Sequence, residues 1–415
     1  MPKITRFPPF GKRFFRLARK LIGACQFQHF WRMVLAVAGM QGRRSLQRIE
    51  LLTDQQRSRQ AIAHFLTRAE WDAPGLLWET ALDALKQLGY RPGDTIYLLL
   101  DDTQKRKRGK QMDAVSKIFL HAEKVYAQGH TLLGAALVYR QAVIPCAVRL
   151  WASQARCQEG LKAAPGEPLK FRKLTELAAT LIDEARQRLA DAKRIVLFDA
   201  YYLCPAVTEA CARTQSRYVG VAKKNRNFAP DGRPRDRRKL SRYGAGVLER
   251  EGRATMVRGK KHRLAERVGW LSKGGRVKLA FSRRPRETAW VALATNEPRW
   301  SAKTIVDHYL TRWGIEVLFK MSKQYLGLGD YQLLEYRGVV RYLHLVLIAY
   351  LLLTHLALAA DAKACAERDK PLRLPSIPKL QETLRGKLWD DLIAHLESGR
   401  KTRLAARKIK QMIQR

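Results

Sequence analysis

A stripe of polar side chains follows one face of the segment 308–325 (HYLTRWGIEVLFKMSKQY). At 100° per residue of a helix, five positions fall within an arc of roughly 80°: Tyr309, Arg312, Glu316, Lys320 and Lys323. One carboxylate would therefore stand among cations, while the opposite face rests on a core. A surface helix with ordinary i,i+4 and i,i+7 ion pairs shows the same pattern, so amphipathicity alone does not establish a site.

Two aspartates lie upstream of this segment, each directly after a short apolar run. Residues 95–100 (TIYLLL) precede Asp101, and residues 194–198 (RIVLF) precede Asp199. Continuous apolar runs of this length predict buried strands, so both acids are expected at strand ends. Together with Glu316 they would supply only hard oxygen ligands, without histidine or cysteine. That donor set favours Mg²⁺ or Mn²⁺ over zinc.

The elements around the aspartates follow a definite order. The patterns predict strands at 95–100, 131–139 and 142–151, a helix over 171–189, a strand at 194–198, a second helix, and a strand at 218–222. Arg140 and Gln141, between the second and third strands, predict a hairpin. This α/β order matches the ribonuclease H-like fold, in which the first strand lies beside the strand that follows the helix. The acidic strand ends would then converge, although 98 positions separate Asp101 from Asp199.

The spacing of the stripe is more specific than its amphipathicity. The pattern Y-(2)-R-(3)-E-(6)-K resembles the signature of the YREK class of bacterial insertion-sequence DDE transposases, and it is carried by Tyr309, Arg312, Glu316 and Lys323. The resemblance implies that Asp101, Asp199 and Glu316 form the catalytic, metal-binding triad of such an enzyme. It also implies that Tyr309, Arg312 and Lys323 contact the DNA of the transposon end.

The implied activity is metal-dependent DNA cleavage and strand transfer, that is, cut-and-paste transposition. Two ions about 3.5–4 Å apart would clamp the attacking and leaving oxygens at a phosphodiester. Asp101 is preferred as the first acid because Thr103 follows it two positions later, as is common in the family. Asp102 stays an alternative, since side chains alternate along a strand and the two neighbours cannot both face one metal.

The composition favours a nucleic-acid partner. The 415 residues carry 79 Lys and Arg against 37 Asp and Glu, a formal net charge of +42, and the basic residues are spread over the whole length. A polyanion such as double-stranded DNA would neutralise this field. The resemblance implies a homodimer on terminal inverted repeats and target DNA. Six cysteines without a C-x-x-C pair indicate reduced thiols of a cytoplasmic, nucleoid-associated protein.

Five regions are expected along the chain. They are a helical, basic DNA-end-binding region (1–93), a first catalytic part (94–225), a basic β-rich insertion (226–298), a second catalytic part with the glutamate helix (299–365), and a basic helical tail (366–415). Two short helices over 45–52 and 56–68 fit a helix-turn-helix-like unit. Residues 226–286 contain 20 Lys and Arg against 5 Asp and Glu, which also suits a charged loop at 225–242.

Two features leave alternatives open. Residues 342–360 contain no Asp, Glu, Lys or Arg and are long enough to span a bilayer, but a buried central helix is the preferred interpretation, with no membrane partner.

In the family an aromatic residue of the insertion stacks on a flipped base, and Trp270, Trp290 and Trp300 are all candidates. A nuclease of the same fold that does not join strands, or an inactive DNA-binding protein, would share much of this sequence.

Overall fold

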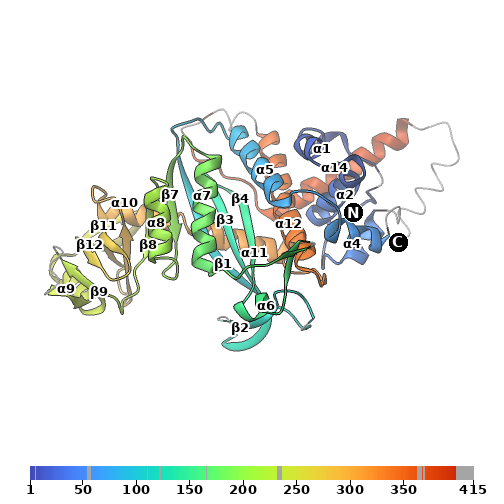
Figure 1. The fold of residues 1–415 in the computed structure, drawn as a ribbon. Coiled ribbons are helices and arrows are strands. Elements are labelled where there is room, and N and C mark those ends of the chain that lie inside the picture. The colour runs from blue at the N-terminus through green and yellow to red at the C-terminus, as the bar shows by residue number, and fades with distance from the viewer. Residues whose placement is uncertain are drawn as a thin grey trace.

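The computed structural model describes residues 1–4, 6–53, 58–109, 111–120, 123–164, 166–230, 236–361, 367 and 370–398. The fold is mixed α/β, as the sequence predicted, and is built on one large mixed sheet (Figure 1). Its strand order is β10-β9-β12-β13-β14-β8-β7-β1-β3-β2, with β11 paired to β12 and β4 paired to β3.

The bounds of the strands are as follows: β1 Thr95–Arg106, β2 Ser116–Leu120, β3 Val125–Tyr139, β4 Ala142–Trp151, β5 Lys162–Ala164, β6 Glu167–Pro168, β7 Lys193–Phe198, β8 Arg217–Val221, β9 Asn227–Pro230, β10 Arg238–Lys239, β11 Arg253–Val257, β12 Lys260–Leu271, β13 Gly275–Arg283 and β14 Trp290–Thr295. The short strands β5 and β6 form a separate two-stranded sheet.

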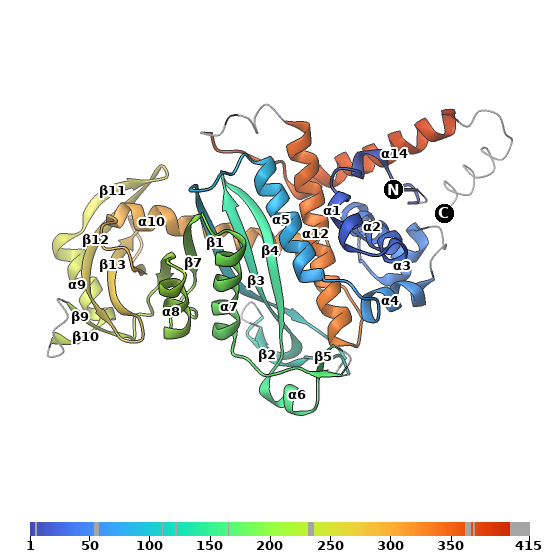
Figure 2. The ribbon, with the colours of Figure 1, turned by 45° about the horizontal axis from the view of Figure 1, so that its top comes forward.

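The helices are η1 Pro9–Gly11, α1 Arg16–Leu21, α2 Ala24–Gly39, α3 Leu46–Leu52, α4 Arg59–Thr67, α5 Ala73–Gln87, α6 Gln154–Gln158, α7 Leu174–Arg188, α8 Pro205–Arg213, α9 Leu240–Glu251, α10 Ala302–Leu310, α11 Trp313–Tyr325, α12 Tyr336–Ala360 and α14 Ile377–Ser398. Helices α1 to α4 gather at one end of the molecule, and the strands β9 to β13 lie at the other (Figure 2).

The strand β1 forms the centre of the sheet and extends beyond the predicted apolar run. Its first half pairs in parallel with β7, and this pairing ends at the pair Leu100 and Phe198. Its second half continues to Arg106 by antiparallel pairing with β3. Asp101 and Asp199 are therefore the next residues on two neighbouring strands, directly after the last parallel pair. The parallel pairing thus brings Asp101 and Asp199 to neighbouring positions, as expected, although Asp101 lies within β1 and only Asp199 follows a strand end.

The predicted hairpin is present in β3 and β4. Its two-residue turn consists of Arg140 and Gln141, with φ of 50° and 68°. Positive φ at both turn positions gives the backbone twist that two-residue hairpins require. The strand β3 is longer than predicted, because it also pairs with β2 through residues 125–129.

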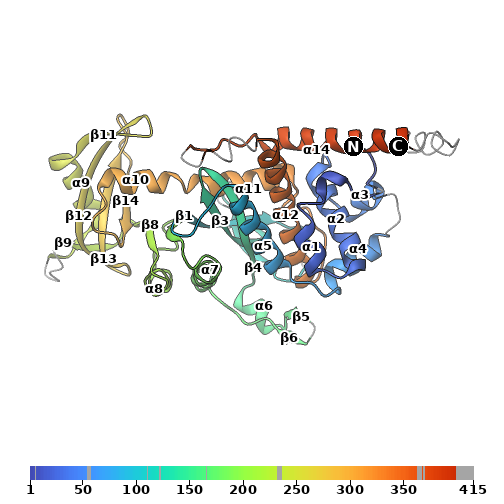
Figure 3. The same ribbon diagram turned by 90° about the horizontal axis from the view of Figure 1, so that it is seen from above.

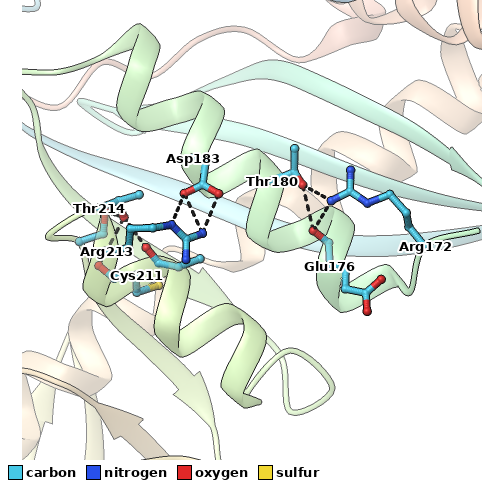
Figure 4. Close-up of polar contacts among 9 residues, drawn as sticks. Arg172, Glu176, Thr180, Asp183, Cys211, Arg213 and Thr214 are labelled. Carbon is cyan, nitrogen blue, oxygen red and sulfur yellow. Dashed lines mark hydrogen bonds and ion pairs between the residues drawn. The ribbon is translucent and has the colours of Figure 1, made fainter. Parts of the chain in front are cut away.

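Helices cover both faces of the central strands. Figure 3 shows α11 on one side of β1 and β3, and α7 on the other. On the α7 face, α8 packs beside α7, and Arg213 forms a bidentate ion pair with Asp183 across the two helices, at 2.7 and 3.0 Å (Figure 4). The helices α7 and α8 therefore cover one face of the central strands, and α11 covers the other.

The long apolar segment is a core helix. The helix α12 is the one described helix that is long and apolar enough to cross a membrane, and 83% of its most apolar window is buried inside the molecule. It packs against α2, α4, α5, α14 and β4. Most of residues 342–358 are thus buried against protein, as the preferred interpretation of the sequence required, whereas residues 359 and 360 are exposed.

The basic region after β8 continues the same sheet. The strand β14 pairs antiparallel with β8 and links β13, β12, β9 and β10 to the central strands. The β-rich character expected of this region is present in the strands β9 to β14, but α9 was not predicted, and part of the stretch 225–242 forms β9, β10 and the start of α9. The basic residues of the tail beyond Ser398 lie outside the described residues.

Candidate active site

The segment 308–325 forms two helices, so the prediction of a single helix is wrong. The helices α10 and α11 meet at Thr311 and Arg312, where the backbone bonds shorten to the i→i−3 type. The Arg312 N–H donates to the Tyr309 carbonyl at 2.9 Å, and the Gly314 N–H donates to the Thr311 carbonyl at 3.1 Å. Both junction residues keep right-handed helical dihedral angles, so the turn tightens and the stripe is kept.

The helix α11 reaches the sheet through a close contact with β3. Gly134 of β3 lies beneath the ring of Phe319, and a Cβ at this glycine would come within 2.6 Å of that ring. Phe319 and its neighbours Ile315 and Leu318 are buried. Glu316 directly follows Ile315 in the helix, and its side chain is about one-third exposed. The absence of a side chain on Gly134 thus lets the helix bring Glu316 close to β1.

Arg312 joins two of the three predicted acids. Its Nη1 lies 2.9 Å from Oδ2 of Asp101, and its Nη2 binds Oε1 of Glu316. The three side chains are only 15%, 17% and 32% exposed. Burial lowers the pKa of Arg312, but Tyr309, Asp101 and Glu316 outweigh that effect and raise it. Arg312 is therefore a permanent cation between the carboxylates of β1 and α11.

The third acid, Asp199, follows β7 directly. Its Oδ1 accepts the backbone N–H of Tyr201 at 2.8 Å. Burial raises the pKa of Asp101 to about 7; Arg312 opposes this, and the negative charges of Asp199 and Asp102 add to it. Crowded carboxylates in a site of low polarity repel one another, so a cation is needed to keep all of them ionised.

The neighbouring acids of β1 have different partners. Asp102 accepts a hydrogen bond from the hydroxyl of Tyr202 at 2.8 Å, whereas Asp101 pairs with Arg312. Tyr202 is fully buried, and burial together with Asp102 raises the pKa of its hydroxyl, which keeps it a donor. The alternation along β1 thus sends the two carboxylates to separate partners, as expected for successive strand residues.

The remaining residues of the stripe surround this centre. Tyr309 packs on Arg312, with the guanidinium carbon 5.6 Å from the ring centroid. Lys323 turns toward β1 and donates to Thr103 Oγ1 at 2.6 Å and to the Gln104 carbonyl at 2.8 Å. Lys320 is exposed. The structure therefore places Tyr309 against Arg312, and it places Arg312 and Lys323 against β1.

The donor set suits a divalent cation, although the acids are not drawn together around a metal position. Within the described ranges, no group of three His, Cys, Asp or Glu side chains has the arrangement of a metal site. Arg312 instead lies between Asp101 and Glu316 and binds both. These oxygens already attract positive charge, and they are of the hard type that Mg²⁺ and Mn²⁺ prefer. Asp101, Asp199 and Glu316 are the residues that would hold such an ion.

The three candidate tryptophans differ in exposure. Trp270 of β12 is 54% exposed, whereas Trp290 of β14 is 9% exposed and packs against Phe281. Trp300 lies against His308, with ring centroids 4.5 Å apart. Of the three, Trp270 has the most ring surface free to meet a ligand.

Sequence reasoning missed a group of cations next to Lys323. Lys105, Arg106 and Arg108 line a groove of about 630 Å³ together with Lys323. The run KRKRGK at 105–110 was the available signal. It was overlooked because β1 was expected to end at its acids.

The fold and the site define an α/β protein that carries carboxylates among cations beside the central strands β1 and β7 of its sheet. Residues 25–274, which are 250 of the 415 residues, match the family model described as DDE superfamily endonuclease. The chain belongs to this family. The matched range contains Asp101 and Asp199 and ends before Glu316.

Two further comparisons complete this result. No curated protein matches the sequence. The structure is similar to one described as the cryo-EM structure of piggyBac transposase synaptic complex with hairpin DNA. That similarity has a TM-score of 0.47 and 12% sequence identity, and it covers 97% of this chain and 80% of the other.

Proposed function

We propose that this DDE-family chain is a transposase of the YREK class, which cleaves the ends of its insertion sequence and joins them to target DNA. One observation carries the proposal: Arg312 joins Asp101 of β1 to Glu316 of α11, next to the strand end that holds Asp199. The family model covers the two aspartates, and the spacing of the stripe supplies the glutamate.

The metal-binding acids of the proposed enzyme are Asp101, Asp199 and Glu316. Mg²⁺ or Mn²⁺, as two ions, would activate the attacking hydroxyl or water and stabilise the leaving oxygen at a phosphodiester. Asp101 is preferred over Asp102 because Tyr202 occupies the carboxylate of Asp102.

The cations of the stripe have positioning roles in this proposal. Arg312 neutralises the acids in the free protein and is long enough to turn to a phosphate when DNA and metal arrive. Lys323 holds Thr103 and Gln104 and presents charge to the backbone of the transposon end. Tyr309 extends the same contact surface. Trp270, exposed on β12, is the proposed base-stacking residue of the insertion.

The finer features of the fold belong to the same proposal. We assign residues 94–225 and 299–365 to a ribonuclease H-like catalytic domain, interrupted by the basic insertion 226–298. The antiparallel β1–β3 pair and the parallel β1, β7 and β8 support this assignment. The helical region 1–93 would bind the DNA ends. A homodimer would act on the DNA in the cytoplasm, and the tail 366–415 would touch DNA or the second subunit.

Strand transfer separates the proposed transposase from a nuclease of the same family. The protein is mixed with Mg²⁺, a supercoiled target plasmid, and a pre-cleaved duplex that ends in the DNA bordering this gene. A transposase joins the duplex end to the plasmid, and the joined product is lost with Asp199→Asn. Cleavage of intact ends without any joined product would contradict strand transfer and identify a nuclease.

A further inference from the structure

A basic groove extends from the candidate active site toward the hairpin formed by β2 and β3. Lys105, Arg106 and Arg108 line it from β1 and the residues after it, and Lys323 lines it from α11. Glu123, from the hairpin, is the one acidic residue among those described in its lining, and it lies 3.3 Å from Arg106. Both partners of this pair are more than half exposed, so it offsets little of the positive charge.

Two lysines of the groove, Lys105 and Lys323, lie close enough for their positive charges to repel each other. Burial lowers the pKa of Lys323 to about 8, and the positive charge of Lys105 adds to that effect. Both hydrogen bonds of the Lys323 ammonium go to neutral oxygens, those of Thr103 and Gln104. An anion beside Lys105 and Lys323 would relieve the repulsion between them. A row of phosphates satisfies this requirement along the whole groove.

The hairpin presents an aromatic side chain beyond the groove. Tyr126 of β3 is 67% exposed and packs on Phe119 of β2, with ring centroids 5.1 Å apart. The ammonium of Lys117 lies 4.9 Å from the ring centroid of Tyr126. In Figure 1, β2 lies at the lower edge of the molecule, away from the strands β9 to β12 and from the helices α1 and α4. An exposed tyrosine beside a lysine suits contact with the sugar–phosphate backbone.

The groove lies at a fixed distance from the acids. Asp101 and Lys105 are four residues apart on β1, which corresponds to about 13 Å at the rise of a strand. Glu316 and Lys323 are seven residues apart on α11, or about 10 Å at the rise of a helix. Since Lys323 binds Thr103 and Gln104, the helix and the strand run in the same direction away from the acids. At 3.4 Å per base pair, the groove begins about three to four base pairs from them.

We propose that this groove and the β2–β3 hairpin bind duplex DNA on one side only of the cleaved phosphodiester. The contact begins three to four base pairs from the cleaved bond, with Lys105, Arg106 and Lys323 on phosphates and Tyr126 against the backbone beyond them. The inference rests on the proposed function, because it takes the position of the cleaved bond from Asp101, Asp199 and Glu316. Apart from Lys323, which belongs to the signature, the residues of this DNA-binding element lie outside the signature, the basic insertion and the N-terminal helices.

A photocross-linking experiment on the full-length chain tests this proposal. Benzoylphenylalanine replaces Tyr126, and the protein is mixed with a duplex that carries one element end at its centre, in Ca²⁺ to hold the complex uncut. We expect cross-links to lie on one side of the cleavage point only. The matched control places benzoylphenylalanine at Glu209 instead. Glu209 is exposed on α8, on the opposite face of the sheet, and this position should give no cross-links. Cross-links spread over both sides, or none from position 126, would overturn the proposal.

A charge experiment supplies a second measurement. Lys117→Ala with Lys124→Ala removes two exposed cations of the hairpin. The measured quantity is the dependence of the DNA-binding constant on salt concentration. If both lysines contact phosphates, the magnitude of the slope of log K against log salt concentration should fall by about 1.8. The matched variant, Lys86→Ala with Lys193→Ala, removes two exposed cations from the other end of the sheet and should keep the slope. Equal slopes in the two variants would contradict the proposal.

The two measurements do not depend on catalysis, so the two levels of inference can fail separately. If the protein cuts the element end in Mg²⁺ but gives no cross-link from position 126, the proposed function stands and the proposed DNA contact of the groove is rejected. A protein that cross-links on one side but never cuts keeps the groove as a DNA-binding element and loses the proposed function.

Discussion

The Nη1 atom of Arg312 lies 2.9 Å from Oδ2 of Asp101, and the same guanidinium binds Glu316. Two acids that are 215 residues apart in the sequence therefore share one partly buried cation. The guanidinium thus links the carboxylate of β1 to that of α11 and offsets the charge of both. It also makes Arg312 the residue whose removal should change the titration of the site most directly.

The substitution Arg312→Gln should raise the pKa of Asp101 further above about 7. The reason is that Arg312 is the cation that opposes the effect of burial on this carboxyl, and an adjacent arginine lowers a carboxyl pKa by about 1–3. Carboxyl ¹³C NMR of the metal-free protein measures the change. The variant Lys320→Gln, on the exposed side of the same helix, is the control and should leave the titration unchanged. A pKa of Asp101 that falls in Arg312→Gln would contradict the structure.

The two neighbouring acids of β1 should have different mutant phenotypes. We expect Asp101→Asn to lower the cleavage rate more than about 100-fold, because outer contacts of a metal site alone are worth about 10–100-fold. Asp102→Asn should keep substantial activity and lose mainly stability, because Asp102 is held by Tyr202 away from Arg312. Parallel cleavage assays and thermal melts distinguish these outcomes. If Asp102→Asn were the inactive variant, the choice of first acid would be reversed.

The close contact between β3 and α11 predicts a steric phenotype. A Cβ at Gly134 would lie 2.6 Å from the ring of Phe319. Gly134→Ala should therefore destabilise the protein by about 1–3 kcal/mol, the usual cost of overpacking a core. The displaced helix should also cleave more slowly, because it carries Glu316. Urea unfolding midpoints measure the first effect. The double variant with Phe319→Leu should recover part of the loss, and a Gly134→Ala protein as stable as wild type would refute this packing.

How much of this arrangement could be predicted from the sequence depends on the range of the interactions involved. The strand end before Asp199, the turn at Arg140 and Gln141, and the buried helix α12 follow from local patterns, and all three are present. A local pattern was sufficient in these cases because the partner strands and helices required the same residues to be buried.

The missed features depend on residues far apart in the chain. The strand β1 continues through six polar residues after Leu100 because β3 offers a complete row of partners, from Gly134 to Gly129. Asp and Lys, which make up three of the six, are depleted in strands, so tertiary pairing decides here. The break between α10 and α11 and the partner of Asp102 likewise depend on contacts that no spacing displays.

A buried lysine gives a prediction for stability against pH. Lys107 is 8% exposed, and its ammonium donates to the carbonyls of Gly329 and Tyr331 at 2.9 and 3.1 Å. Burial lowers its pKa to about 7 from 10.5. Between these values the unfolded chain binds more protons, so the free energy of unfolding should rise with pH, by up to about 1.4 kcal/mol per pH unit.

The variant Lys107→Met removes this proton equilibrium. Its free energy of unfolding, measured by urea titration from pH 7 to 10, should rise less steeply with pH than that of wild type. The comparison of slopes cancels the contributions of other titrating groups. The same slope in both proteins would show that Lys107 titrates normally in the folded state.

The most direct test of the central claim is cleavage of a supercoiled plasmid that carries this gene with its flanking DNA. Wild type is compared in Mg²⁺ with Glu316→Gln, which keeps the shape and hydrogen bonding of the side chain but removes its charge, and with Lys320→Gln on the same helix. We predict cutting at the element ends by wild type and Lys320→Gln, and none by Glu316→Gln. Equal cutting by wild type and Glu316→Gln would contradict the assignment of the acids, and tight DNA binding without cutting by any of the three would contradict an active transposase.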